Sequence, residues 1–365
     1  MYARGIINRR YAYQGPHSLT LDIINACNIN CVGCNYHSFR RNKDSFSPEW
    51  HQEKMRGEDF IRIIDEAEKM NIRHIALCGN GEPFMHPDIL QFISYIKQKK
   101  IWCRVITNGT LIDKNTLHSL SSLRLDYLTL SLWDHDIERN EELRPGHKEK
   151  LQNIKKWLNY YREKRMVSPA INVNYMLSNR NYNFIHEMYK FAKENNIKRI
   201  SFKLFRILEG LAEDYALSEQ QIAIIIEQLK EISRTDRGKI VKDIHYFYRF
   251  LQGVHPERWL YLNDFLLYMP CYIGWIFMTI SLNGDVAPCC GCPKYILGNI
   301  YQNKLSEIWN SKKYQEFRYR ALTDKSSKEF DGCRCKELCA QHQLNLMVHK
   351  HFGRFVSPFV DRNQD

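Results

Sequence analysis

Residues 18–235 alternate between short apolar segments and longer amphipathic segments, and this alternation constrains the fold more than any other feature. SLTLDIIN, residues 18–25, has the length and composition of a strand, whereas GEDFIRIIDEAEKMN, residues 57–71, carries its apolar residues at the spacing of a helix. About six such β-then-α units follow one another, which predicts a parallel sheet with helices on its outside. The fold class is therefore α/β, a partial (β/α)6 TIM-like barrel.

The functional residues of such barrels lie at the C-terminal ends of the strands. Three segments directly follow the first three predicted strands: Cys27–Cys34, Gly79–Pro83 and Thr107–Gly109. Ser131 lies on the fourth predicted strand and Lys203 on the sixth. We therefore expect these residues to meet at one edge of the sheet.

The chain has 12 cysteines, and ten of them fall into two sets. The sets are Cys27, Cys31 and Cys34, and then Cys271, Cys289, Cys290, Cys292, Cys333, Cys335 and Cys339. No segment reaches the roughly 20 apolar residues of a membrane helix, and no secretory signal is apparent, so we expect a cytoplasmic protein. Clustered cysteines in a reducing compartment predict metal rather than disulfides.

The first set has the spacing Cys27-x-x-x-Cys31-x-x-Cys34. Three thiolates can hold three irons of a four-iron cube and leave the fourth iron open to a cofactor. A zinc site with His37 as the fourth ligand would also fit this spacing. The spacing alone favours the cluster, because structural zinc sites usually use paired CxxC motifs.

A second motif, Cys78-Gly-Asn-Gly-Glu-Pro83, follows the second predicted strand. With this motif the chain resembles the radical S-adenosylmethionine superfamily, whose members carry CxxxCxxC and a GGEP-type motif at these two places. The resemblance covers roughly residues 18–340. Many members have an aromatic residue before the third cysteine, where this chain has Gly33. We expect Tyr36 or His37 to cover the cluster instead.

The resemblance implies a 4Fe-4S cluster that binds S-adenosylmethionine and cleaves it reductively to a 5′-deoxyadenosyl radical. The electron would come from a donor such as flavodoxin or ferredoxin. The residues that the resemblance assigns to cofactor binding are Gly79, Asn80, Gly81, Glu82, Pro83, Thr107, Asn108, Ser131, Arg144 and Lys203. Each one taken alone also has an ordinary explanation, such as a turn asparagine or a solvated arginine.

The C-terminal cysteines are similar to the SPASM/Twitch extension of radical enzymes, with a Cys…Gly-x4-Cys core, a GNI turn and an EIWNS helix. The similarity implies one auxiliary 4Fe-4S cluster, with a second one possible only if more cysteines take part. Its ligands would be Cys271, Cys289 and two of Cys333, Cys335 and Cys339. A structural zinc ribbon is the alternative. Cys290 and Cys292 are then surplus, either buried bystanders or donors of a hydrogen atom to a substrate radical.

These observations predict five regions along the chain. They are an N-terminal lead-in (1–17), the barrel (18–235), an aromatic bridging segment (236–270), the auxiliary cluster domain (271–345) and a C-terminal tail (346–365). The cysteine motif begins at residue 27, so we expect no leader-binding module of the kind that many peptide-maturing relatives carry.

We therefore expect a small-molecule substrate, such as a sugar, an aminoglycoside-like compound or a nucleotide sugar, and a dehydrogenation or an epimerisation. A peptide maturase is the alternative within the same chemistry. A zinc-stabilised nucleic-acid-binding protein is the alternative of another class, because the net charge is +12. Against it, the Lys and Arg residues are scattered and no recognition helix is evident.

Overall fold

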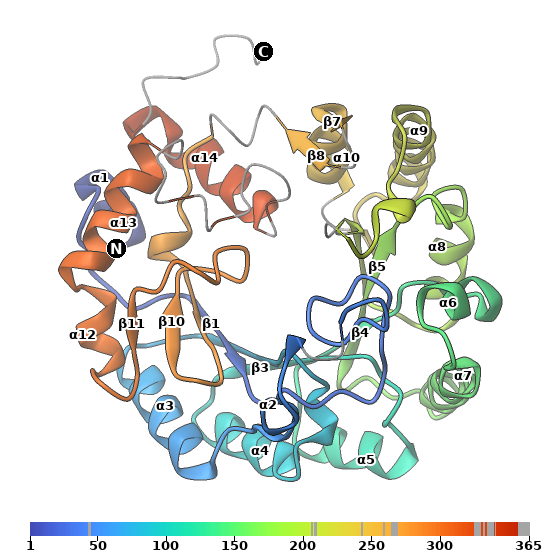
Figure 1. The fold of residues 1–365 in the computed structure, drawn as a ribbon, viewed down its shortest axis with the longest axis horizontal. Coiled ribbons are helices and arrows are strands. Elements are labelled where there is room, and N and C mark those ends of the chain that lie inside the picture. Colours follow the sequence, from blue (N-terminus) through green and yellow to red (C-terminus); the bar gives the residue numbers. More distant parts are fainter. Residues whose placement is uncertain are drawn as a thin grey trace. The chain divides into compact units, whose positions relative to one another are not determined.

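The structure is a computed structural model that describes residues 1–42, 45–205, 207, 210–241, 244–257, 260–263, 269–324, 330, 333, 339 and 341–356 (Figure 1). The chain divides into two compact units. Unit 1 comprises Met1–Leu21, Glu58–Ile75 and Leu262–Asp365, and unit 2 comprises Asp22–Gly57 and Ala76–Tyr261.

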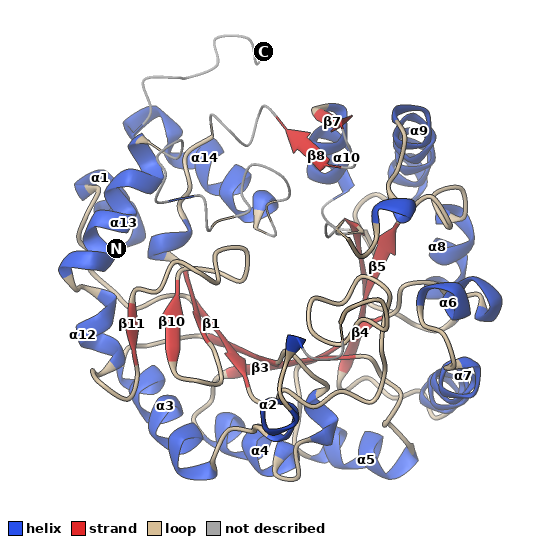
Figure 2. Cartoon of the chain, viewed as in Figure 1, coloured by secondary structure: helices blue, strands red, loops and turns tan. Residues whose placement is uncertain are grey.

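Helices and strands alternate over most of the chain (Figure 2). In chain order the elements are α1 (Tyr2–Asn8), β1 (Ser18–Asp22), α2 (Pro48–Gln52), α3 (Gly57–Lys69), β2 (His74–Cys78), η2 (Pro83–Met85), α4 (Ile89–Gln98), β3 (Trp102–Thr107), α5 (Lys114–Ser122), β4 (Tyr127–Ser131), α6 (Ile137–Leu143), α7 (Lys148–Glu163), β5 (Ala170–Leu177), α8 (Ile185–Glu194), β6 (Arg199–Leu204), η3 (Glu213–Tyr215), α9 (Glu219–Asp236), α10 (Ile244–Gln252), β7 (Val254–Glu257), β8 (Leu260–Asn263), η4 (Ile273–Trp275), β9 (Phe277–Ile280), β10 (Asp285–Ala287), β11 (Gly298–Asn299), α12 (Leu305–Trp309), α13 (Lys312–Thr323) and α14 (His342–Val356).

Unit 2 is built on parallel strands in the order β3-β4-β5-β6. Helices α4, α5, α7 and α8 lie along the outer side of these strands (Figure 1). On β5 the side chains of Ile171, Val173, Tyr175 and Leu177 are fully buried, and the residues between them are half-buried. The side-chain period of two therefore gives β5 one apolar, buried face and one half-buried, largely polar face.

Unit 1 contains strands in the order β11-β10-β9-β1. β9 runs parallel to β1, with Ser18 opposite Phe277, and β10 continues antiparallel to β9. A segment from the cysteine-rich part of the sequence therefore pairs with the first strand of the chain. The sequence did not predict this pairing, because strand pairing between distant segments leaves no local pattern.

A buried arginine organises the core of unit 1. The Arg318 guanidinium, on α13, donates hydrogen bonds to the carbonyl oxygens of Gly274 (2.7 Å), Trp309 (2.5 Å) and Arg10 (3.0 Å). It also lies 4.5 Å from the ring centroids of Trp309 and Tyr314. Burial lowers the pKa of Arg318 to about 10, so the side chain keeps its charge at neutral pH.

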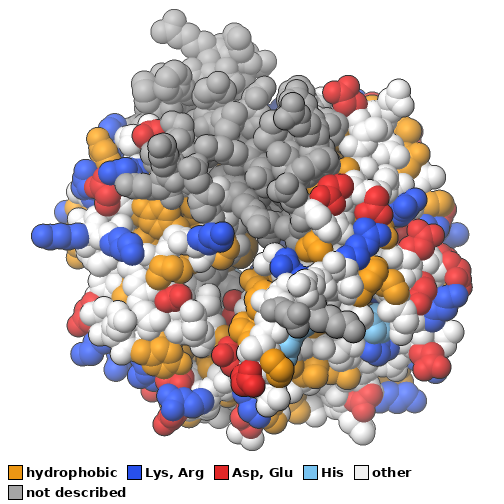
Figure 3. All heavy atoms as spheres, in the orientation of Figure 1, with side chains coloured by type: hydrophobic (Ala, Val, Ile, Leu, Met, Phe, Trp, Pro, Cys, Tyr) orange, Lys and Arg blue, Asp and Glu red, His pale blue; other side chains and the backbone are white. Residues whose placement is uncertain are grey.

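The predicted fold class is confirmed, since a parallel sheet with outer helices forms where the repeated β/α units were expected. No helix in the described ranges is long and apolar enough to cross a bilayer. On the face drawn in Figure 3, Lys and Arg side chains are interspersed with Asp and Glu side chains. This distribution agrees with the scattered basic residues of the sequence.

Candidate active site

The loop that carries Cys27, Cys31 and Cys34 is held by hydrogen bonds from several directions within unit 2. The Val32 N–H donates to the carbonyl of Leu143 (3.0 Å), and the Ser38 hydroxyl donates to the carbonyl of Val32 (2.6 Å). The Cys34 N–H donates to the carbonyl of Cys31 (3.0 Å), which closes a turn between two cysteines. These hydrogen bonds within the protein therefore hold the loop in its conformation.

The three thiols of this loop lie close enough to influence one another electrostatically. Burial raises the pKa of Cys27 to about 12, with further contributions from Cys31, Glu82 and Cys34. Burial also raises the pKa of Cys31, although the Arg144 guanidinium opposes this rise. Thiols this weakly acidic stay protonated unless a cation takes the proton's place. Cys27 and Cys31 would therefore need a cation such as the iron of a cluster to bind as thiolates, and the assignment of this cysteine set as cluster ligands stays a prediction.

Backbone donors surround the third sulfur. The N–H groups of Tyr36 and His37 point at Cys34 Sγ, at 3.4 Å and 3.2 Å. Hydrogen bonds of this kind to a ligand sulfur tune the reduction potential of a cluster. Tyr36 and His37 thus contact the cysteine loop through their backbone, while their rings pack with Trp50 at centroid distances of 5.6 Å and 5.9 Å.

Glu82 joins the loops that follow β2 and β3. Its carboxylate accepts hydrogen bonds from the Thr107 hydroxyl (2.5 Å), the Asn108 N–H (2.7 Å) and the Phe84 N–H (3.2 Å). The side chain is 2% exposed, and burial raises its pKa in spite of these three donors. The assignment of Glu82 to cofactor binding, as an acceptor for the cofactor's ammonium group, stays a prediction.

Gly79 and Gly81 allow the loop after β2 to lie against the segment before Cys27. A Cβ on Gly79 would come within 2.5 Å of the Ile24 carbonyl oxygen, and one on Gly81 would overlap the Ala26 carbonyl. The Gly81 N–H donates to the Ile24 carbonyl at 3.0 Å. Neither glycine has a positive φ. From the sequence we expected both a close backbone approach and unusual dihedrals at these glycines, and the structure shows the close approach alone.

Asparagine side chains connect the three loops at the ends of β1, β2 and β3. Asn80 donates to Asn25 Oδ1 (3.0 Å), and Asn108 donates to Asn28 Oδ1 (2.9 Å). Asn28 in turn donates to the Thr110 hydroxyl (2.8 Å). Sequence reasoning missed Asn25 and Asn28, although both flank Cys27. A signal was present, since polar amides directly beside a cysteine motif can cross-link neighbouring loops.

Arg144 lies at the end of α6 with a buried guanidinium, 3% exposed. Its Nη2 donates to the carbonyl of Ser131 (2.5 Å), and its Cζ lies 4.9 Å from the ring centroid of Trp133. Its Nε is buried and has no hydrogen-bond acceptor among the described residues. A buried cation with an unused donor beside Cys31 fits the carboxylate of an amino-acid moiety held at the cluster.

The polar face of β4, β5 and β6 brings further predicted residues together. Ser131 pairs with Asn174, and Asn174 pairs with Ser201. One row further along, Lys203 pairs with Met176. Each of these residues is half-buried, so each side chain is partly accessible to solvent. Polar side chains thus lie next to one another along this face of the sheet, whereas the centre of a closed barrel is filled with branched apolar residues.

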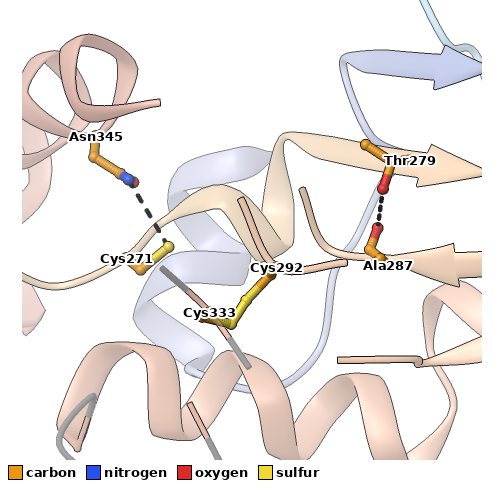
Figure 4. The surroundings of a disulfide bond; sticks show 6 residues. All are labelled: Cys271, Thr279, Ala287, Cys292, Cys333 and Asn345. Atoms are coloured by element: carbon orange, nitrogen blue, oxygen red, sulfur yellow. Dashed lines mark hydrogen bonds between the residues drawn. A yellow bond between two sulfur atoms is a disulfide. The ribbon is translucent and has the colours of Figure 1, made fainter. Parts of the chain in front are cut away.

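The C-terminal cysteines gather in unit 1 around Cys289. Burial raises the pKa of Cys289 well above its ordinary value, and Cys290, Cys271 and Cys339 raise it further. The Asn345 side-chain amide lies 3.8 Å from Cys271 Sγ (Figure 4). It also lies 3.9 Å from Cys339 Sγ. The Asn345 amide is a donor that would suit these sulfurs as ligands of a cluster, and their assignment as ligands stays a prediction. Asn345 is 2% exposed on α14, and sequence reasoning missed it.

Cys292 and Cys333 lie directly beside each other in the structure, with their Cα atoms 4.0 Å apart (Figure 4). A predicted hydrogen-atom donor is thus next to a predicted cluster ligand. Cys290 is exposed, and Cys335 lies outside the described residues. Among the described side chains, no three His, Cys, Asp or Glu residues converge as ligands of a single metal ion. The roles of Cys290, Cys292, Cys333 and Cys335 stay predictions.

Comparison with known families agrees with both cysteine sets. The family model of the radical SAM superfamily matches residues 21–192. A second model, SPASM, described as an iron-sulfur cluster-binding domain, matches residues 271–339. The chain therefore belongs to the radical SAM superfamily, and it carries a SPASM domain in its C-terminal part.

Individual relatives resemble the chain over most of its length. It is 24% identical over 325 residues to the tungsten-containing aldehyde ferredoxin oxidoreductase cofactor-modifying protein of Pyrococcus furiosus, covering 82% of this chain and 83% of the relative. It is 22% identical over 343 residues to the PqqA peptide cyclase of Gluconobacter oxydans, covering 88% and 87%. The crystal structure of Streptococcus suis SuiB bound to precursor peptide SuiA matches with a TM-score of 0.63 and 19% identity, covering 92% of this chain and 74% of that one. The likeness to SuiB shows the fold.

Proposed function

We propose that this radical SAM enzyme abstracts hydrogen from a peptide substrate. The observation that carries the proposal is the polar row Ser131, Asn174 and Ser201, in which Ser131 ends β4 and the other two residues lie within β5 and β6. Hydroxyl and carboxamide side chains both donate and accept hydrogen bonds, as does a peptide backbone. Lys203, one row further, adds a cation that suits a carboxylate on the same substrate.

The comparisons support a peptide better than the small molecule that we expected from the sequence. The PqqA peptide cyclase is a peptide enzyme by name, and this chain covers 87% of it. SuiB, which has a similar fold, was crystallised with its precursor peptide. The expectation of a small molecule depended on a short N-terminal region, and a peptide enzyme of similar extent weakens that argument.

The chain's own residues would prepare the site for this chemistry. Cys27, Cys31 and Cys34 would hold a 4Fe-4S cluster, and Arg144 would bind the carboxylate of S-adenosylmethionine. Glu82 would keep the loops after β2 and β3 in register. When bound, the cluster and S-adenosylmethionine supply reductive C–S cleavage and hydrogen abstraction. Cys271, Cys289 and Cys339 would hold an auxiliary cluster, and an electron donor such as flavodoxin or ferredoxin would reduce the protein.

In the experiment, reconstituted enzyme is incubated anaerobically with dithionite, S-adenosylmethionine and synthetic peptides. The peptide sequences are those encoded by short genes next to the gene of the enzyme. We expect one peptide to increase 5′-deoxyadenosine formation and to change in mass, or to take up deuterium in heavy water if the reaction is an epimerisation. Sugars and nucleotide sugars form the comparison set. Stimulation by a member of that set, with every peptide inert, would contradict the proposal and restore the small-molecule substrate.

A further inference from the structure

Gly33, directly before the third cysteine of the motif, faces an aromatic ring from a distant part of the chain. A Cβ on Gly33 would come within 2.8 Å of Phe205 Cε1 and would overlap Cζ. Gly33 does not have a positive φ, so the backbone conformation itself does not require glycine. The requirement comes from packing, because the Phe205 ring occupies the space where a side chain would be.

Phe205 follows β6 and is held firmly on its other sides. It is 1% exposed, packs edge-to-face on Trp133 at 5.2 Å and stacks on Tyr215 at 5.5 Å between ring centroids. Trp133 in turn lies under the Arg144 guanidinium at 4.9 Å. We call Trp133, Phe205 and Tyr215 the aromatic wall. It extends from the guanidinium beside Cys31 to the peptide beside Cys34.

An ion pair joins the same two segments at a second point. Arg40, just after the cysteine loop, contacts Asp214 through two hydrogen bonds of 2.5 Å and 2.9 Å. The same guanidinium donates to the carbonyl of Leu211 (3.0 Å) and lies 5.2 Å from the Tyr215 ring centroid. The pair is partly exposed, so it adds geometric definition more than stability. Both contacts attach the cysteine loop to the segment after β6.

We propose that Phe205 is a positioning residue for the cysteine loop. Its ring fills the space left by Gly33, fixes the peptide of Cys34 and shields that side of the loop from water and oxygen. In the family that the chain resembles, an aromatic residue directly before the third cysteine would fill this space. In this chain the aromatic ring comes from Phe205, at the end of β6. Tyr36 and His37, which we expected to cover the cluster, contact Cys34 Sγ through their N–H groups and pack their rings with Trp50, and their covering role stays a prediction. The proposal rests on the cluster assigned to Cys27, Cys31 and Cys34.

The test compares five forms of the holoenzyme: wild type, Phe205→Ala, Gly33→Ala, the double variant Gly33→Ala/Phe205→Ala, and Phe92→Ala as a control. Phe92 is a buried phenylalanine of α4 in the same unit, 4% exposed. The readouts are the rate at which the cluster absorbance bleaches in air and the change in the reduced cluster's electron paramagnetic resonance signal on adding S-adenosylmethionine. The second readout isolates the cofactor-binding cluster from an auxiliary one.

We expect Phe205→Ala to bleach several-fold faster than wild type and Phe92→Ala. Gly33→Ala should lower cluster content through the clash, and Phe205→Ala should restore part of that loss in the double variant. Bleaching of Phe205→Ala at the wild-type rate, or an unaffected Gly33→Ala, would overturn the proposal. Bleaching is measured without a substrate, so that result would leave the peptide assignment as it stands.

Discussion

Replacing Glu82 with glutamine separates a structural role for this residue from a cofactor-binding one. Glutamine retains an oxygen for the Thr107 and Phe84 donors, but its NH2 group would face the Asn108 N–H, which now donates to Glu82 Oε2 at 2.7 Å. Asn108 is 6% exposed, so its N–H would stay buried without an acceptor. That penalty is about 1–3 kcal/mol, and losing the charge on the Thr107 bond adds about 1 kcal/mol.

We therefore expect Glu82→Gln to destabilise unit 2 by about 3 kcal/mol, which lowers the melting temperature of a domain this size by about 6–12 °C. The assay is anaerobic calorimetry at one scan rate without S-adenosylmethionine. The control is Glu163→Gln, an exposed residue on α7, which should change stability by less than about 0.5 kcal/mol. A Glu82→Gln variant that melts with wild type but binds S-adenosylmethionine weakly would refute the structural role and restore the ammonium contact.

Three further predictions follow from the cysteine sets and from one buried histidine. Cys34→Ala should lose about four irons per chain and all 5′-deoxyadenosine formation, whereas Cys289→Ala should lose a similar amount of iron and still cleave S-adenosylmethionine. Iron analysis and chromatography of the products distinguish the two variants. Equal loss of cleavage in both variants would contradict separate clusters. Asn345→Leu removes the amide beside Cys271 and Cys339, so a redox titration should show that the auxiliary cluster has become harder to reduce. An unchanged reduction potential would contradict this prediction. The His86 ring accepts a hydrogen bond from the Asp88 N–H (3.1 Å) and contacts the Met55 carbonyl (2.9 Å), and only the neutral ring can make both contacts. Burial lowers the pKa of His86; the charge of Asp88 opposes this shift and the charge of Lys54 adds to it. The stability from neutral His86 should therefore be complete above about pH 6.5 and decrease at lower pH, so the melting temperature of His86→Gln should depend less on pH between 7 and 5.5 than that of wild type.

Much of the fold could be predicted from the sequence because local patterns determine it. The two-residue period of AINVNYML defines β5 to the residue, and the helical spacing of residues 57–71 places α3. The cysteine motif and the Gly-Asn-Gly-Glu-Pro turn likewise identify one end of the sheet, since both directly follow strands.

The contacts that shape the site could not be predicted, because they join residues far apart in the sequence. Nothing near Glu82 indicates that Thr107 and Asn108 will take up its carboxylate. Nothing near Gly33 indicates that the ring beside it belongs to Phe205. Such pairings depend on how the strands are ordered in space, whereas the sequence pattern reports only the direction and burial of each strand.

The most direct test of the whole account is the metal and product content of anaerobically purified protein. We predict about eight irons and a matching amount of sulfide per chain, for two 4Fe-4S clusters, with 5′-deoxyadenosine formed once dithionite and S-adenosylmethionine are added. Zinc in place of iron, with no cleavage of S-adenosylmethionine, would contradict the account.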